Sequence, residues 1–174
     1  MTGGEIATRW TVRLAVALYF TALVVRVKFP SVESCQARAR WAWTAGFVIF
    51  LVHVLCAFHF FHHWSHDAAY LNTAQKTAAM TGWNWGGGLY LNYLFALIWG
   101  IEVLWWWHGL AVYENRSKFA EWCIQTFLFF ITFNATIVFG TGLIRWAGIA
   151  GGLILFAAFI SNRRPRLKIP RHGR

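Results

Sequence analysis

The chain has 174 residues, of which 58% are hydrophobic and only 13% charged, and its mean hydropathy is +0.46. Soluble domains contain about 45–50% apolar and about 25% charged residues, so this composition excludes a soluble globule. The formal net charge of +10 does not indicate nucleic acid, because the Lys and Arg residues lie between and after long apolar runs. That placement suits the anionic headgroups of a lipid bilayer.

Five apolar runs are long enough to cross a bilayer. The predicted spans are residues 10–27, 41–61, 89–112, 122–139 and 143–160. We therefore expect an all-α fold, a polytopic integral membrane protein with a bundle of five transmembrane helices. Residues 1–160 form its single transmembrane domain, and residues 161–174 a basic cytoplasmic tail that meets anionic lipid headgroups.

A weakly amphipathic stretch separates the second and third spans. Residues 68–85 have too few apolar side chains to cross a bilayer, which predicts a short interfacial helix that ends near Thr81 and Gly82. Gly86, Gly87 and Gly88 follow it and predict a hinge.

The basic residues predict the orientation. With five spans, the first loop, the third loop and the tail lie on one side and carry 4, 2 and 6 of the 16 Lys and Arg residues. The other side carries the remaining 4. This bias places the N-terminus outside and the C-terminus in the cytoplasm. The predicted location is a membrane, which in a bacterium would be the cell or inner membrane.

Histidines gather at the outer end of the second span. If its helix continues beyond Phe61, the 100° rotation per residue places four of them on one face about 100° wide. His59 and His63, like His62 and His66, would be four residues apart, a spacing that suits chelation of one ion. The predicted metal ligands are His59, His62, His63 and His66, with Asp67 in support. Imidazole and carboxylate suit Zn, Cu or Fe, and the alternative is that interfacial histidines bind no metal.

The pattern His59-x-x-His62-His63 resembles one histidine box of the membrane fatty-acid desaturases and hydroxylases. The resemblance implies a di-iron centre held by several such boxes. This sequence contains no second box, so a lipid oxygenase would need further ligands from another chain.

Three polar residues that are costly to place in lipid lie well inside the predicted spans: His53, Glu102 and Asn134. At 1.5 Å per residue, they lie about 18, 15 and 18 Å from the predicted cytoplasmic ends of their helices. A shared depth predicts one polar layer near the midplane, either a proton relay or hydrogen-bonded packing between helices. A haem b held by two histidines fits less well, because His108 lies about 12 Å from the level of His53.

Two classes of function remain open. The first is a small membrane protein with a histidine metal site at its outer face, in a redox or metal-handling complex. The second is a non-catalytic scaffold or assembly subunit, with other membrane subunits or further copies of itself as partners. No catalytic residue is identified, and we do not expect the isolated chain to be an enzyme.

Overall fold

The computed structural model describes residues 3–163, and this part of the chain contains helices and no strands. Its long helices are α1 (Gly3–Lys28), α2 (Glu33–Phe60), α4 (Gly88–His108), α6 (Lys118–Phe133) and α7 (Leu143–Arg163). The others are α3 (His66–Thr81), α5 (Leu110–Glu114) and a π-helical turn, η1 (Asn134–Val138), which extends α6 to a run of 21 residues. The predicted tail lies outside the described residues from position 164 onward.

Five helices are long and apolar enough to cross a membrane: α1, α2, α4, α6 with η1, and α7. Helices α1 and α2 begin well before the predicted spans, at Gly3 and Glu33. The short helix predicted between the second and third spans is present as α3, and Gly82 ends it in the left-handed conformation that favours glycine. The sequence therefore predicted the number of membrane-length helices correctly and the first residues of α1 and α2 less well.

The third span is shorter than predicted. We expected a helix over residues 89–112, but α4 ends at His108, and a break at Gly109 separates it from α5. Hydropathy could not find this break, because the apolar run continues through Val112. The break turns the chain so that α5 and the loop after it fold back against the end of the bundle.

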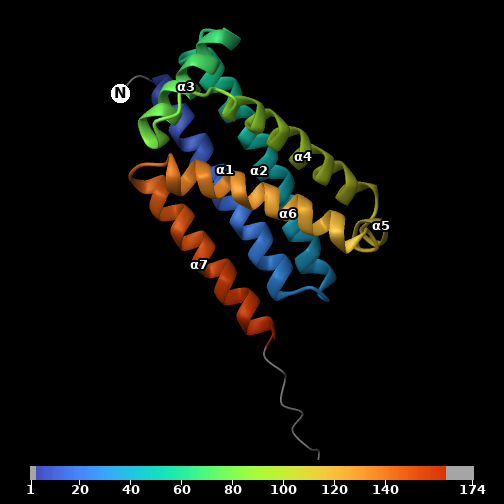
Figure 1. The fold of residues 1–174 in the computed structure, drawn as a ribbon. Helices are drawn as coiled ribbons and strands as arrows, with labels where there is room; N and C mark the ends of the chain where they lie inside the picture. The colour runs from blue at the N-terminus through green and yellow to red at the C-terminus, as the bar shows by residue number, and fades with distance from the viewer. Residues whose placement is uncertain (1–2, 164–174) are drawn as a thin grey trace, which may run out of the picture.

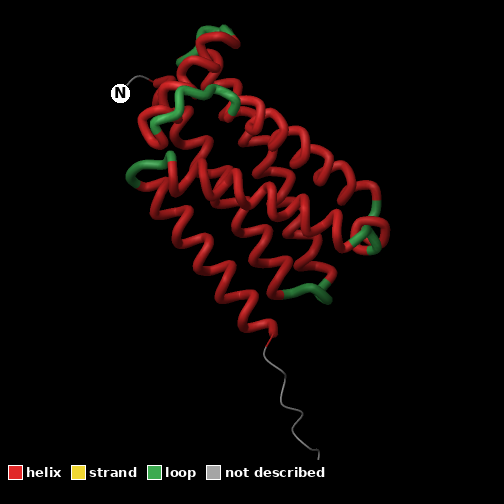
Figure 2. The backbone as a smooth tube through the Cα atoms, in the orientation of Figure 1, coloured by secondary structure: helices red, strands yellow, loops and turns green. Residues whose placement is uncertain are grey.

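The long helices run in alternating directions along one axis (Figures 1 and 2). Helix α1 packs against α2 and α7, α4 packs against α2 and α6, and η1 packs against α7. We call the end with α3 and the 61–65 turn the histidine end. We call the end with the α1–α2 turn, α5 and the start of α6 the basic end.

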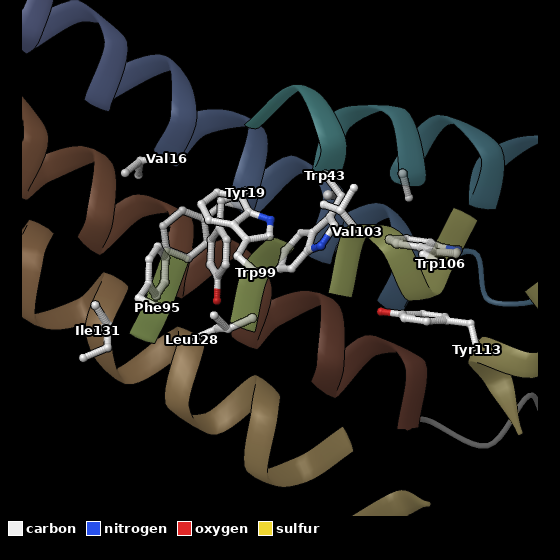
Figure 3. Close-up of a cluster of buried hydrophobic side chains, with 13 residues drawn as sticks. Val16, Tyr19, Trp43, Phe95, Trp99, Val103, Trp106, Tyr113, Leu128 and Ile131 are labelled. Carbon is white, nitrogen blue, oxygen red and sulfur yellow. The ribbon is translucent and has the colours of Figure 1, made fainter. Parts of the chain in front are cut away.

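Aromatic side chains fill the centre of the bundle (Figure 3). Tyr19, Trp43 and Trp99 come from α1, α2 and α4, and each ring centroid lies 5.2–5.5 Å from the other two. All three are at most 2% exposed. Large aromatic rings bury much area and pack edge to face or tilted, as here. This cluster fixes the spacing of the three helices.

Glycines of α7 bring it close to its neighbours. A Cβ at Gly148 would overlap the Thr136 side chain of η1, lying 2.7 Å from its Cβ, and one at Gly151 would overlap the ring of Phe20. A Cβ at Gly152 would meet nothing within 4 Å. Two of these glycines therefore serve packing inside the chain, and Gly152 lies at an open surface.

Candidate functional site: a buried ion-pair network at the basic end

The histidine end does not have the geometry that the sequence predicted. Helix α2 ends at Phe60, so the expectation that it continues through His66 was wrong. His63 and Trp64 follow with φ angles of 49° and 60°, in the left-handed region that reverses a chain locally. The 100° rotation per residue does not apply beyond Phe60, and the predicted i,i+4 pairs do not lie on one helical face.

Two of the histidines have aromatic hydrogen-bond partners. His59 Nδ1 accepts a hydrogen bond from the indole N–H of Trp64 at 3.3 Å. His66 begins α3, where its Nδ1 lies 3.2 Å from the Tyr93 hydroxyl and its Nε2 lies 3.4 Å from the Tyr90 hydroxyl. These bonds dock the start of α3 on α4.

The other predicted ligands, His62, His63 and Asp67, lie in the turn and the first turn of α3. Burial lowers the pKa of the His62 imidazole, and the nearby positive charges of Lys76 and His63 lower it further. Among residues 3–163, no group of three or more His, Cys, Asp or Glu side chains could hold a metal ion. The structure thus gives no support to a metal site at the histidine end.

The three residues of the predicted midplane layer have separate hydrogen-bond partners. His53 Nδ1 lies 2.9 Å from the backbone carbonyl of Thr8, so that nitrogen carries a proton and donates it to α1. Asn134 is partly exposed and bonds to the carbonyl of Phe130 on its own helix at 2.8 Å. Equal depth does not set which way a side chain points around its helix. The expected polar layer of His53, Glu102 and Asn134 is therefore not formed.

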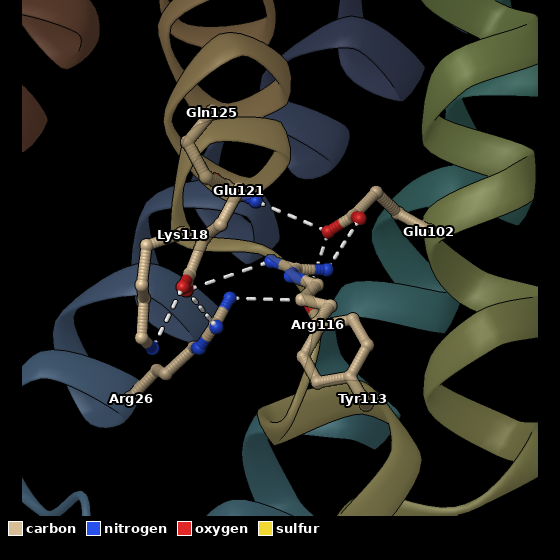
Figure 4. Close-up of polar contacts among 7 residues, drawn as sticks. All are labelled: Arg26, Glu102, Tyr113, Arg116, Lys118, Glu121 and Gln125. Carbon is tan, nitrogen blue, oxygen red and sulfur yellow. Dashed lines mark hydrogen bonds and ion pairs between the residues drawn. The ribbon is translucent and has the colours of Figure 1, made fainter.

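Glu102 instead belongs to a network at the basic end (Figure 4). Its side chain is 0% exposed, and it accepts hydrogen bonds from three donors. Arg116 Nη1 lies 2.6 Å from Oε1, and Tyr113 Oη and Gln125 Nε2 lie 2.8 and 3.1 Å from Oε2. The donors come from the loop before α6, from α5 and from α6, so one carboxylate joins four separate segments.

A second carboxylate extends the network towards α1. Glu121 Oε1 lies 2.6 Å from Arg26 Nη2 and 3.5 Å from Arg116 Nη2, and its Oε2 lies 3.1 Å from Lys118. Arg26 also donates to the Tyr113 hydroxyl at 3.0 Å. The two carboxylates are balanced by two arginines within the bundle, and Lys118 lies at the rim with 81% of its side chain exposed.

Aromatic rings hold the cations in place. The guanidinium carbon of Arg116 lies 4.0 Å from the ring centroid of Tyr113, and that ring stacks on Trp106 at 4.9 Å with an interplanar angle of 3°. Arginine favours such stacked sites. Burial, opposed by the charge of Arg26, raises the pKa of the Tyr113 hydroxyl, which keeps it a hydrogen-bond donor to Glu102.

Only one member of this network was identified from the sequence. Glu102 was singled out as a buried acid, whereas Arg116, Tyr113 and Gln125 were treated as loop or span residues. One signal was available, because a buried acid needs a cation and Arg116 is the first Lys or Arg residue after it.

No protein-family model, curated protein or solved structure matches this chain.

Proposed function

We propose that the chain is a five-span integral membrane protein with its basic end in the cytoplasm. Five apolar helices support this proposal, as do the large apolar side chains exposed along them, among them Leu97, Leu104, Phe130 and Phe156. The bias of 12 to 4 in Lys and Arg between the two sides supports the orientation. A bilayer would cover the exposed apolar surface.

We further propose a structural role, as a non-catalytic scaffold or assembly subunit of a membrane complex. The observation that carries this proposal is the ion-pair network around Glu102. An acid poised for proton transfer needs a free path to a donor or acceptor. The Glu102 carboxylate is instead buried and bonded to Arg116, Tyr113 and Gln125 of its own chain. It joins α4, α5 and α6 as a fixed cross-link.

The aromatic core supports the same role. Tyr19, Trp43 and Trp99 occupy the centre of the bundle, where a redox cofactor would need room between the helices. His53 is bonded to the backbone of α1. Glu102 and His53 thus hold helices together, a known use of polar side chains in lipid.

The test starts with protein purified in mild detergent from its own membranes, without chelators. We expect co-purification with another subunit, or with further copies of this chain, in fixed stoichiometry, together with less than about one tenth of an equivalent of Zn, Cu or Fe. One equivalent of a transition metal that is lost on His59→Ala with His63→Ala would overturn the scaffold proposal in favour of the metal site. A haem absorption band would overturn it in favour of an electron-transfer subunit.

A further inference from the structure

We propose that Arg40 and Trp107 form a binding site for the phosphate group of an anionic phospholipid at the basic end. The inference rests on the proposed membrane insertion and adds a specific ligand to it. It is separate from the tail, which was the predicted contact for lipid headgroups, and separate from the Glu102 network. The site centres on Arg40, an arginine that the fold holds in place without an anionic partner among residues 3–163.

Arg40 lies at the boundary of the bilayer. It precedes a run of 26 residues, 41–66, that contains no Asp, Glu, Lys or Arg. Trp107 is the second-last residue of α4, at the same end of the bundle. Arginine and tryptophan at such a boundary place charge and indole at the level of the lipid headgroups.

The arginine side chain is fixed by stacking. Its guanidinium carbon lies 4.2 Å from the centroid of the Trp107 ring. Trp107 in turn donates its indole N–H to the Thr44 hydroxyl at 2.9 Å, and that hydroxyl donates to the backbone carbonyl of Arg40 at 2.9 Å. Trp41, 62% exposed, packs edge-on against Trp107 with centroids 4.8 Å apart. The ring under the cation is therefore held in one orientation.

No anion within the described part of the chain neutralises this cation. Among residues 3–163, Arg40 forms neither an ion pair nor a side-chain hydrogen bond, and its buried Nε lacks a partner. Arg26 and Arg116, at the same end, both pair with glutamates. A guanidinium with free donors matches phosphate oxygens, which it binds in a bidentate manner. Phospholipid headgroups place phosphates at this depth, and an anionic lipid presents its phosphate without the headgroup cation that neutralises a zwitterionic one.

The experiment measures lipid bound to the full chain by native mass spectrometry. Protein in mild detergent is titrated with phosphatidylglycerol, with phosphatidylcholine, and with inorganic phosphate as a competitor. We expect one preferentially retained phosphatidylglycerol and about tenfold weaker retention in Arg40→Gln, the loss expected for a charge-assisted bidentate contact. Arg38→Gln is the matched control, because Arg38 is exposed on the same helix, and it should change retention less than about twofold.

Two further variants test the geometry. Arg40→Lys keeps the charge without the planar fork and should recover only part of the retention, and Thr44→Val should weaken retention by releasing the indole. Equal retention by wild type and Arg40→Gln would overturn the proposal. Displacement of the lipid by millimolar inorganic phosphate would overturn its assignment to a lipid. Flotation with phosphatidylcholine vesicles tests membrane insertion separately from the lipid site. If the protein floats with the vesicles but Arg40→Gln does not change lipid retention, the chain is a membrane protein without this site.

Discussion

Nη1 of Arg116 lies 2.6 Å from Oε1 of Glu102, and neither side chain is more than 1% exposed. The two residues are only fourteen positions apart in sequence, yet the end of α4, a helix break and α5 lie between them. A buried pair of this kind contributes little net free energy when intact, because both charges lose their hydration. Removing one partner is costly, because the other charge then remains buried alone.

The first prediction concerns this pair. Glu102→Gln and Arg116→Gln should each lower the free energy of unfolding by about 3–5 kcal/mol, and the double variant should cost less than the sum of the two. The measurement is reversible unfolding in mixed detergent and SDS micelles, followed by circular dichroism. Lys118→Gln is the control, since its exposed pair with Glu121 should be worth at most about 1 kcal/mol. Strict additivity of the two single changes would contradict a direct pair.

The second prediction concerns the close contact between α7 and η1. Gly148→Ala should destabilise the protein by about 1–3 kcal/mol, because the added methyl overlaps the side chain of Thr136. Gly152→Ala, four residues later on the same helix, should be neutral or stabilise by up to about 1 kcal/mol. Thermal unfolding of the two variants in one detergent provides the comparison. Equal losses of thermal stability in the two variants would contradict the close contact between Gly148 and Thr136.

The third prediction concerns acid stability at the histidine end. The folded protein favours neutral His62, because burial first, and then Lys76 and His63, lower its pKa. As the pH falls through about 6.5, the unfolded chain binds a proton at this position before the folded protein does. Wherever the unfolded state binds more protons than the folded state, the free energy of unfolding decreases as the pH decreases. The wild-type protein should therefore lose stability between pH 7 and pH 5.

His62→Gln isolates that contribution. The variant should lose less stability than wild type over the same pH range, by a small margin, because the His62 side chain is only partly buried. Chemical unfolding at pH 5, 6 and 7 measures the difference. Parallel pH profiles of the two proteins would show that His62 takes no part in acid destabilisation.

The fourth prediction concerns orientation. In a background that lacks the three natural cysteines, Asn84→Cys places a thiol in the loop after α3, and Ser31→Cys places one in the α1–α2 turn. A membrane-impermeant maleimide should label the first in intact cells and the second only after the cells are opened. The reverse pattern would invert the proposed topology, and labelling of both in intact cells would contradict an odd number of spans between the two sites.

The sequence by itself determined the class of fold. Helix formation in this chain follows from local hydropathy, so the five long apolar runs, the short α3 and its end at Gly82 could be predicted without any tertiary contact. Such features depend on residues that are close in sequence. The acid at position 102 was evident for the same reason, as the one acidic residue in its apolar run.

Tertiary structure decided what these residues contact. The sequence placed His53, Glu102 and Asn134 at one depth, but depth says nothing about rotation around each helix axis, and the three have separate partners. The break at Gly109 turned Arg116 back towards Glu102, and the left-handed turn at His63 ended the helix that a shared histidine face required. Helix azimuths and chain reversals depend on packing between distant segments, so only the folded bundle fixed the candidate site.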